Sequence, residues 1–262
     1  MTAIEAKAPV YGATYPSLRD RTVLITGGGS GIGEEIVRHF VQQGSRVAFI
    51  DNAEEPSRKL VAKIESEGAT AHYENVDLTV IDDVRAAIAR VKEKLGPIDI
   101  LVNNAANDQR VKFGEVTSEY WDNRIAVNLK HQFFCAQSVI DDMIAAGGGA
   151  IVNVGSFAYD AGFDDVLPYL CAKSGVIGLT RGLAFEMGKH NIRVNCVMPG
   201  WIMTERALKN WVGEEGNATL MRNQCLKRML YPAEVAKVIL FFASDEASAC
   251  TNQSYLVDGG WV

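Results

Sequence analysis

The sequence predicts an α/β fold with a single doubly wound parallel sheet and helices on both faces. Short apolar, β-branched runs alternate with longer segments of helical period along the chain, which is typical of successive strand–helix–strand units. The runs are almost continuously apolar, as expected of strands buried on both faces. No linker, repeat or low-complexity tract divides the 262 residues, and a single α/β domain can reach this length.

Seven runs are expected to form the strands of this sheet. They are residues 22–26, 46–51, 71–78, 98–106, 150–156, 193–200 and 254–260. Helices are expected in between, most clearly where Val84, Ile88 and Val91 recur at helical spacing. We expect an N-terminal extension over residues 1–18 and one domain over residues 19–262. Residues 202–224 look irregular and contain two glycines, so we expect a mobile lid there.

Composition excludes several classes of function. The net charge is −6 and the isoelectric point is about 5.3, so neither nucleic acid nor an anionic membrane is an expected partner. No apolar stretch approaches the ~20 residues that span a bilayer, and the N-terminus does not resemble a signal peptide. The five cysteines include no CxxC pair and the four histidines are dispersed, so we expect no metal site and no disulfide framework. A cytoplasmic location is expected.

A glycine-rich segment, TGGGSGIG at 26–33, follows the first predicted strand and opens the first predicted helix. Gly27, Gly31 and Gly33 allow the chain to turn sharply and let the backbone approach a pyrophosphate at the helix N-terminus. A glycine-rich turn alone is a weak signal. Its position between a strand and a helix favours a Rossmann dinucleotide-binding site.

Asp51 ends the second predicted strand, roughly 20 residues beyond the first glycines. A carboxylate at this place can accept hydrogen bonds from the adenosine ribose and would repel a 2′-phosphate. No Arg or Lys lies in the glycine turn or directly after Asp51. The sequence therefore favours NAD over NADP. The alternative is that Asp51 only caps the following helix.

Tyr169 and Lys173 lie four residues apart at the start of an apolar helix and share one face of it. The lysine ammonium, together with a positive nicotinamide ring, is expected to favour the phenolate and so to lower the pKa of Tyr169. Ser156, at the end of the preceding strand, can hold a substrate oxygen while Tyr169 moves the proton. Asn128 is an unusual residue inside a helical segment. It either holds a water for proton relay or is a satisfied buried amide.

These motifs together resemble the short-chain dehydrogenase/reductase family, from Leu18 to Val262. The matching segments are TGGGSGIG, VDL at 76–78, NNAA at 103–106, VNL with Asn128, VGS with Ser156, YLCAK with Tyr169 and Lys173, and PGWIMT at 199–204. One departure is Ala106, where the family usually has glycine. The added methyl group is not expected to prevent cofactor binding.

The resemblance implies roles for individual residues. Asn128, Ser156, Tyr169 and Lys173 would form the catalytic tetrad, and the family usually forms homotetramers. The residues implied in cofactor binding are Gly27, Ser30, Gly31, Ile32, Gly33, Asp51, Asp77, Leu78, Asn104, Ala105, Tyr169, Lys173, Pro199, Gly200, Ile202 and Thr204.

Other segments resemble bacterial aldose 1-dehydrogenases of the D-xylose, D-galactose or L-arabinose type. They include residues 104–110, 120–137, 223–236 and 244–251. This similarity implies a small-molecule sugar substrate. The expected substrate contacts are Asn107, Ser156, Tyr169 and Trp201, with Asp108 as a further polar candidate and Tyr159 as a further ring.

The predicted function is therefore NAD-dependent oxidation of the anomeric hydroxyl of an aldose to the aldonolactone, with Tyr169 as general base. One alternative is a dehydrogenase or reductase of the same family that acts on another alcohol or ketone, of 3-oxoacyl or steroid type. A second is a non-enzymatic NAD-binding regulator. All four tetrad residues are present, which disfavours this second alternative.

Overall fold

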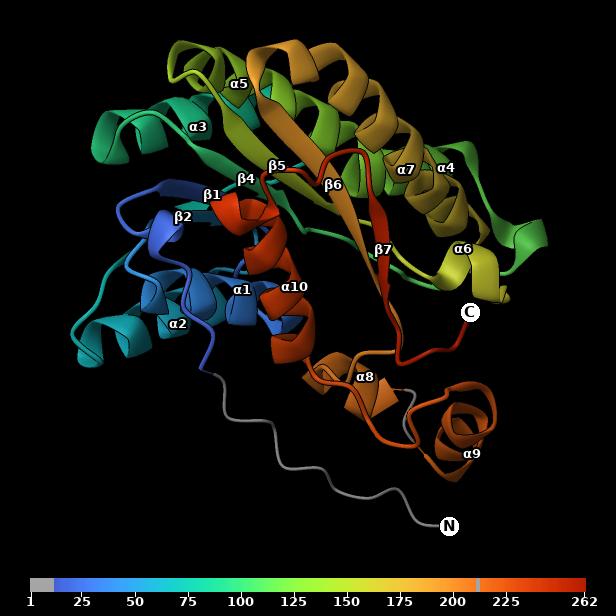
Figure 1. The fold of residues 1–262 in the computed structure, drawn as a ribbon. Helices are drawn as coiled ribbons and strands as arrows, with labels where there is room; N and C mark the ends of the chain where they lie inside the picture. Colours follow the sequence, from blue (N-terminus) through green and yellow to red (C-terminus); the bar gives the residue numbers. More distant parts are fainter. Residues whose placement is uncertain (1–11, 211–212) are drawn as a thin grey trace.

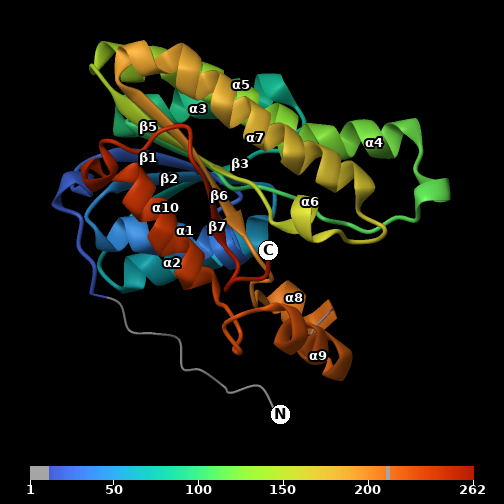
Figure 2. The ribbon, with the colours of Figure 1, turned by 45° about the vertical axis from the view of Figure 1, so that its right-hand side comes forward.

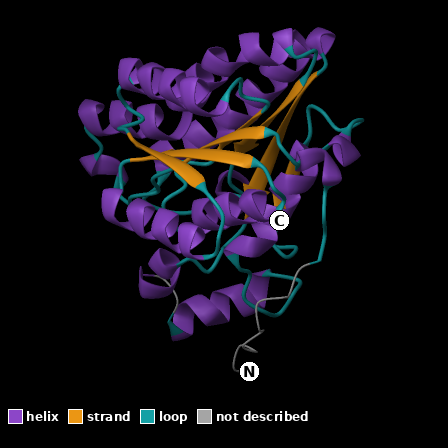
Figure 3. Cartoon of the chain, turned by 90° about the vertical axis from the view of Figure 1, so that its left-hand side faces the viewer, coloured by secondary structure: helices purple, strands orange, loops and turns teal. Residues whose placement is uncertain are grey.

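The computed structural model describes residues 12–210 and 213–262 of the chain. Residues 1–11 of the predicted N-terminal extension and residues 211–212 of the predicted lid lie outside the described residues. Within the described ranges, a sheet lies between two layers of helices (Figure 1 and Figure 3). The predicted fold class is confirmed.

The sheet has seven strands in the order β3-β2-β1-β4-β5-β6-β7, and every neighbouring pair is parallel. The strands are β1 (Thr22–Thr26), β2 (Arg46–Asp51), β3 (Ala71–Asn75), β4 (Ile100–Asn103), β5 (Gly149–Val154), β6 (Ile192–Pro199) and β7 (Ser254–Val257). The chain runs outward from β1 to β3, then returns to the other side of β1 and runs from β4 to β7. The strand order thus reverses between β1 and β4, where ligands bind in open α/β sheets.

Helices cover both faces of the sheet (Figure 1 and Figure 2). One layer holds α1 (Gly31–Gln42), α2 (Glu54–Ser66) and α10 (Pro232–Ala243), and the other holds α3 (Ile81–Leu95), α4 (Ser118–Ile125), α5 (His131–Ala145) and α7 (Leu167–Met187). Shorter elements are η1 (Pro16–Leu18), η2 (Phe113–Glu115), a π-helix η3 (Ala126–Lys130), α6 (Ala158–Ala161), η4 (Gly188–His190) and η5 (Asp245–Ala247).

Alternate residues of the central strands enter the two cores. On β1, Val23 and Ile25 pack with α1 and α10, whereas Leu24 packs with α3 and α5. All three side chains are fully buried. Because side chains alternate across a strand, burial of both faces demands the unbroken apolar runs seen in the sequence. Leu18 of the predicted extension is also buried and joins the first core.

The predicted irregular segment 202–224 differs in the structure. It contains two short helices, α8 (Glu205–Asn210) and α9 (Glu214–Asn223), which lie beyond the carboxyl ends of the strands (Figure 1). The prediction of irregular structure was wrong because Gly213 is the N-cap residue of α9 and Gly216 lies in its first turn, so neither interrupts the middle of the helix. None of the helices in the described ranges has the length and apolar character required to cross a membrane.

Truncation of a core ring should destabilise the fold far more than truncation of a surface ring. Phe40 on α1 is fully buried, whereas Phe113 on η2 is 79% exposed. We expect Phe40→Ala to lower the free energy of unfolding by about 3–5 kcal/mol, because it leaves a cavity in the core. Phe113→Ala should change it by less than about 0.5 kcal/mol. Urea denaturation measures both, and similar losses for the two variants would contradict this description of the core.

Candidate active site

The glycine turn joins β1 to α1 and is shaped by close backbone packing. Gly27 has a φ of 68° and Gly31 a φ of 58°, a region that side chains disfavour. A Cβ atom on Gly33 would lie 1.7 Å from the carbonyl oxygen of Gly27. The turn therefore accepts only glycine at this point, and it leaves the first N–H groups of α1 directed toward a cleft.

This cleft, termed here the glycine-turn cleft, has a volume of about 860 Å³. It lies across the sheet edge where the strand order reverses. Of the residues predicted to bind cofactor, twelve line it: Gly27, Ser30, Gly31, Ile32, Gly33, Asp51, Asp77, Leu78, Asn104, Ala105, Tyr169 and Thr204. The open glycine turn and the Asp51 carboxylate fit a dinucleotide, with the pyrophosphate at the N-terminus of α1 and a ribose at Asp51.

Asp51 is fixed at the end of β2 by two backbone groups. Its Oδ2 accepts a hydrogen bond from the N–H of Gly29 at 2.8 Å, and its Oδ1 accepts one from the N–H of Ala53 at 2.8 Å. The carboxylate thus holds both the glycine turn and the start of α2. It also borders the cleft, so the role at the helix start and a role toward a ligand are compatible.

A second, smaller cavity, termed here the inner cavity, has a volume of about 240 Å³ and opens beside the cleft. The two spaces share Ile32, Asn104, Ala106, Asp108, Tyr169 and Thr204. The other predicted cofactor residues, Lys173, Pro199, Gly200 and Ile202, line the inner cavity only. Tyr169 therefore stands where the two spaces meet, within reach of a ligand in either.

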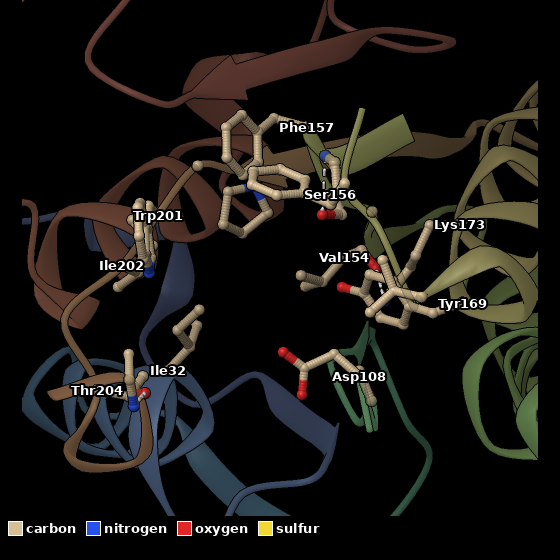
Figure 4. A pocket seen from close by; sticks show the side chains of 18 of the residues that line it. Ile32, Asp108, Val154, Ser156, Phe157, Tyr169, Lys173, Trp201, Ile202 and Thr204 are labelled. Carbon is tan, nitrogen blue, oxygen red and sulfur yellow. Dashed lines mark hydrogen bonds between the residues drawn. The ribbon is translucent and has the colours of Figure 1, made fainter. Parts of the chain in front are cut away.

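Ser156 and Tyr169 come from different elements and face the same cavity (Figure 4). Ser156 follows β5, and its Oγ accepts a hydrogen bond from the N–H of Ala158 at 3.1 Å. Lys173, on α7 one turn after Tyr169, is 1% exposed and its Nζ donates to the carbonyl oxygen of Val154 at 2.7 Å. A strand end and a helix start thus bring three of the four predicted catalytic residues together.

Burial governs the pKa values of this group. Burial raises the pKa of Tyr169 to about 12, although a hydrogen bond with Ser156 acts in the opposite direction. The carboxylate of Asp108 also raises the pKa of Tyr169, whereas the guanidinium of Arg206 lowers it. Burial also lowers the pKa of Lys173 to about 8. The expected fall in the pKa of Tyr169 is therefore not a property of the chain alone. A positive charge brought by a ligand would favour the phenolate.

Asn128 lies in the π-helix and is fully buried. Its Oδ1 accepts from the N–H of Asn107 at 2.8 Å, and its Nδ2 donates to the carbonyl oxygens of Asn107 at 3.0 Å and of Arg124 at 2.9 Å. Both amide hydrogens are therefore used within the chain. This arrangement is the satisfied buried amide, and it clamps the backbone of Asn107 after β4.

The predicted substrate residues lie in two places. Ser156, Tyr169 and Trp201 line the inner cavity, whereas Asn107 lines only the glycine-turn cleft. Tyr159 is absent from the described lining of either space. The additional rings are Phe157 and Phe163, which sequence reasoning missed. Phe157 directly follows Ser156, and that adjacency was the one signal available.

An ion pair connects the two sides of the cleft. The carboxylate of Asp108, after β4, lies 2.8 Å from a guanidinium nitrogen of Arg206 on α8. Sequence reasoning missed Arg206, because nothing in the sequence places the predicted lid beside the segment that follows β4. The contact links α8 to a residue that lines both the inner cavity and the glycine-turn cleft.

Comparison with known proteins agrees with this geometry. The family model described as "Enoyl-(Acyl carrier protein) reductase" matches residues 27–262. The chain is 45% identical to a D-xylose 1-dehydrogenase of Caulobacter vibrioides over 95% of this chain and 98% of the relative. It is 46% identical to a protein of Rhizobium meliloti named probable galactose dehydrogenase, over 94% and 96%.

Solved structures show the same fold. A 7α-hydroxysteroid dehydrogenase complexed with NADH has a TM-score of 0.89 at 31% identity, covering 94% of this chain and 97% of that one. A gluconate 5-dehydrogenase from Burkholderia cenocepacia, in complex with NADP and tartrate, has a TM-score of 0.87 at 31% identity and the same coverage.

The chain belongs to the short-chain dehydrogenase/reductase family. It is an oxidoreductase that acts on CH–OH groups and binds a nicotinamide cofactor.

The charges around Tyr169 give a prediction with opposite signs for two variants. For a reaction that uses the Tyr169 phenolate, kcat/KM rises as pH passes through the pKa of Tyr169. Asp108 raises this pKa and Arg206 lowers it, so Asp108→Asn should move the rise to lower pH and Arg206→Gln to higher pH. Asp82→Asn, a change at a 93% exposed side chain, is the control. Displacement of both profiles in the same direction would contradict the assignment.

Proposed function

We propose that the protein oxidises the anomeric hydroxyl of an aldose of the D-xylose, D-galactose or L-arabinose type to the aldonolactone, with NAD as the cofactor. The observation that carries this proposal is the inner cavity, where a serine and a tyrosine face an aromatic wall in a space of about 240 Å³. A sugar ring suits such a space, because its hydroxyls need hydrogen-bond partners and its C–H face packs on rings. The relatives named for D-xylose and galactose support the same substrate class.

In the proposed reaction, Tyr169 acts as the general base. Its phenolate removes the proton from the hydroxyl on C1, while the hydroxyl of Ser156 holds the same oxygen. A C=O bond forms at C1 as the C1–H bond breaks and its electron pair leaves with the hydrogen. When bound, the nicotinamide ring supplies the acceptor for that hydride. Lys173 adds positive charge beside the phenolate, and Asn128 holds the Asn107 segment in place.

The cofactor-binding residues of the proposal are those named in the sequence analysis. The preference for NAD rests on Asp51, whose fixed carboxylate would bond ribose hydroxyls and repel a 2′-phosphate. Asn107 and Trp201 complete the proposed substrate contacts with Ser156 and Tyr169. Asn107 borders the cleft beside Asp108, and its backbone N–H donates a hydrogen bond to Oδ1 of Asn128.

The proposed assembly is a homotetramer in the cytoplasm. Large apolar side chains stand exposed on the helices that would form such an interface. Phe185 on α7 is 77% exposed, and Phe133 on α5 is 46% exposed. Burial of these rings against further copies of the chain would remove apolar surface from water.

NADH formation at 340 nm, measured with D-xylose, L-arabinose, D-galactose, D-glucose and L-fucose, tests the function. We expect one aldose to give robust turnover with NAD. Tyr169→Phe should lower kcat by about 10³-fold, because it removes the proton acceptor. It keeps the ring that lines the cleft, and the other cofactor-binding residues are intact, so NADH should still bind. Tyr159→Phe, on an exposed ring, is the matched control. Turnover of ketones or other secondary alcohols without any aldose activity would instead select the 3-oxoacyl or steroid type of reaction.

Cofactor choice is tested at Asp51. Asp51→Ala removes the charge that opposes a 2′-phosphate, so the ratio of kcat/KM for NADP to that for NAD should rise by about tenfold or more, equivalent to about 1.4 kcal/mol. Glu65→Ala removes an exposed carboxylate on α2 that does not line the cleft, and should leave the ratio unchanged. An unchanged ratio in Asp51→Ala would remove Asp51 from the specificity argument.

A further inference from the structure

The last five residues, Asp258–Val262, form a segment termed here the C-terminal tail. It follows β7 and is organised around one buried carboxylate. Asp258 is 5% exposed. Its Oδ1 accepts from the N–H of Gly260 at 2.9 Å, and its Oδ2 accepts from the N–H groups of Trp261 and Val262, each at 3.0 Å. A carboxylate that accepts three N–H groups fixes the direction in which the tail leaves the sheet.

The tail is also joined to the chain that leaves α9. The N–H of Leu226 donates to the carbonyl oxygen of Gly259, and the N–H of Cys225 donates to that of Gly260, both at 2.9 Å. A Cβ atom on Gly260 would lie 2.8 Å from the Cβ of Cys225. Two segments more than thirty residues apart in sequence are thus in close contact. The tail therefore lies beyond the carboxyl end of β7, against the segment that follows α9 (Figure 1).

Trp261 contacts three rings of the inner cavity. Its ring centroid lies 5.4 Å from that of Phe157, 5.8 Å from that of Trp201 and 6.4 Å from that of Phe163. The contacts with Phe157 and Trp201 are edge-to-face, an arrangement that aromatic pairs prefer. Those three rings line the inner cavity, whereas Trp261 contacts them without being part of the lining. Phe157 is 5% exposed and follows Ser156 directly (Figure 4).

Loss of the Trp261 ring would remove its contacts with all three rings of the aromatic wall. The three lining rings come from separate segments: the segment between β5 and α6, the loop before α7 and the segment after β6. Among the described residues, Phe157 contacts Phe163 at 5.4 Å, and the other ring contacts that join these segments run through Trp261. The N–H of Phe157 also donates to the carbonyl oxygen of Pro199 at 3.1 Å. The position of the wall relative to Ser156 and Tyr169 therefore depends in part on Trp261.

We infer that Trp261 is a positioning residue for substrate recognition: held by Asp258, it sets the aromatic wall on which the substrate ring packs, so that the C-terminal tail helps to determine specificity. The inference deepens the proposed function and depends on it for the identity of the substrate. It does not assign Trp261 a contact with the cofactor, because the residue lines neither the glycine-turn cleft nor the inner cavity.

Three variants of the full chain test this role. Trp261→Ala should raise KM for the preferred aldose by about tenfold, with a smaller effect on kcat. The dissociation constant of NADH, measured by fluorescence titration, should not change. Trp261→Phe keeps a ring at the site and should restore KM to within about threefold of the wild-type value. Asp258→Asn replaces an accepting oxygen by an NH₂ group and should raise KM in the same direction as Trp261→Ala.

Tyr255→Ala is the matched control. Tyr255 lies on β7, is 54% exposed and contacts Phe242, 6.0 Å away, instead of the cavity rings. It should leave KM unchanged. An unchanged KM in a folded Trp261→Ala variant would overturn the inference. An equal weakening of sugar and NADH binding, not restored by Trp261→Phe, would also overturn it, since it would show general damage to the fold.

Failure of the proposed function is distinguishable from failure of this inference. If the wild-type protein oxidises no aldose, the proposed function fails, and the same four variants are compared on the alcohol or ketone that does turn over. A rise of KM in Trp261→Ala on that substrate, with rescue by Trp261→Phe, supports the role of the tail. Equal KM values for wild type and Trp261→Ala overturn it.

Discussion

The site depends on one constraint, the fixed geometry of the turn between β1 and α1. The side-chain amide of Asn104 donates to the carbonyl oxygens of Thr26 and Gly27, and the carboxylate of Asp51 accepts from Gly29. Residues from the ends of β4 and β2, the strands on either side of β1, therefore hold the turn from both sides. Because β1 is the strand where the order reverses, this clamp fixes the N-terminus of α1 and the Asp51 carboxylate at the cleft that Tyr169 also lines.

Burial is the second constraint, and it opposes formation of the Tyr169 phenolate. A phenol that must lose a proton is placed where its charged form is poorly solvated, and the pKa of Tyr169 rises to about 12 in consequence. The adjacent Lys173 is itself buried, and its pKa falls to about 8. In the proposed reaction, the positive charge of the bound cofactor would lower the pKa of Tyr169, which the side chains of the protein leave high. Such a site would favour the phenolate mainly when cofactor is present.

The features predictable from the sequence are those fixed by local pattern. The strand β1 has apolar side chains on both faces, and the glycine turn lies between a strand and a helix. Tyr169 and Lys173 are one helical turn apart. Each of these signals lies within a few residues. The contacts missed by sequence reasoning are long-range. Arg206 meets Asp108 across the cleft, and Trp261 meets Phe157 across more than a hundred residues. No local period records such pairs, because only the folded sheet brings the segments together.

The parts predictable from the sequence are those of the proposed reaction, and the parts that were missed are those of the proposed substrate site. Ser156, Tyr169 and Lys173 lie at the ends or starts of regular elements, where packing on both sheet faces fixes them. The rings that line the inner cavity, by contrast, come from loops, and they contact one another and Trp261. Reaction chemistry needs fixed distances, whereas substrate choice depends on the shape of a wall that loop residues can alter without disturbing the sheet. In the proposed enzyme, substitutions at Phe163, Trp201 or Trp261, far in sequence from the glycine turn, would therefore change the substrate and keep the reaction.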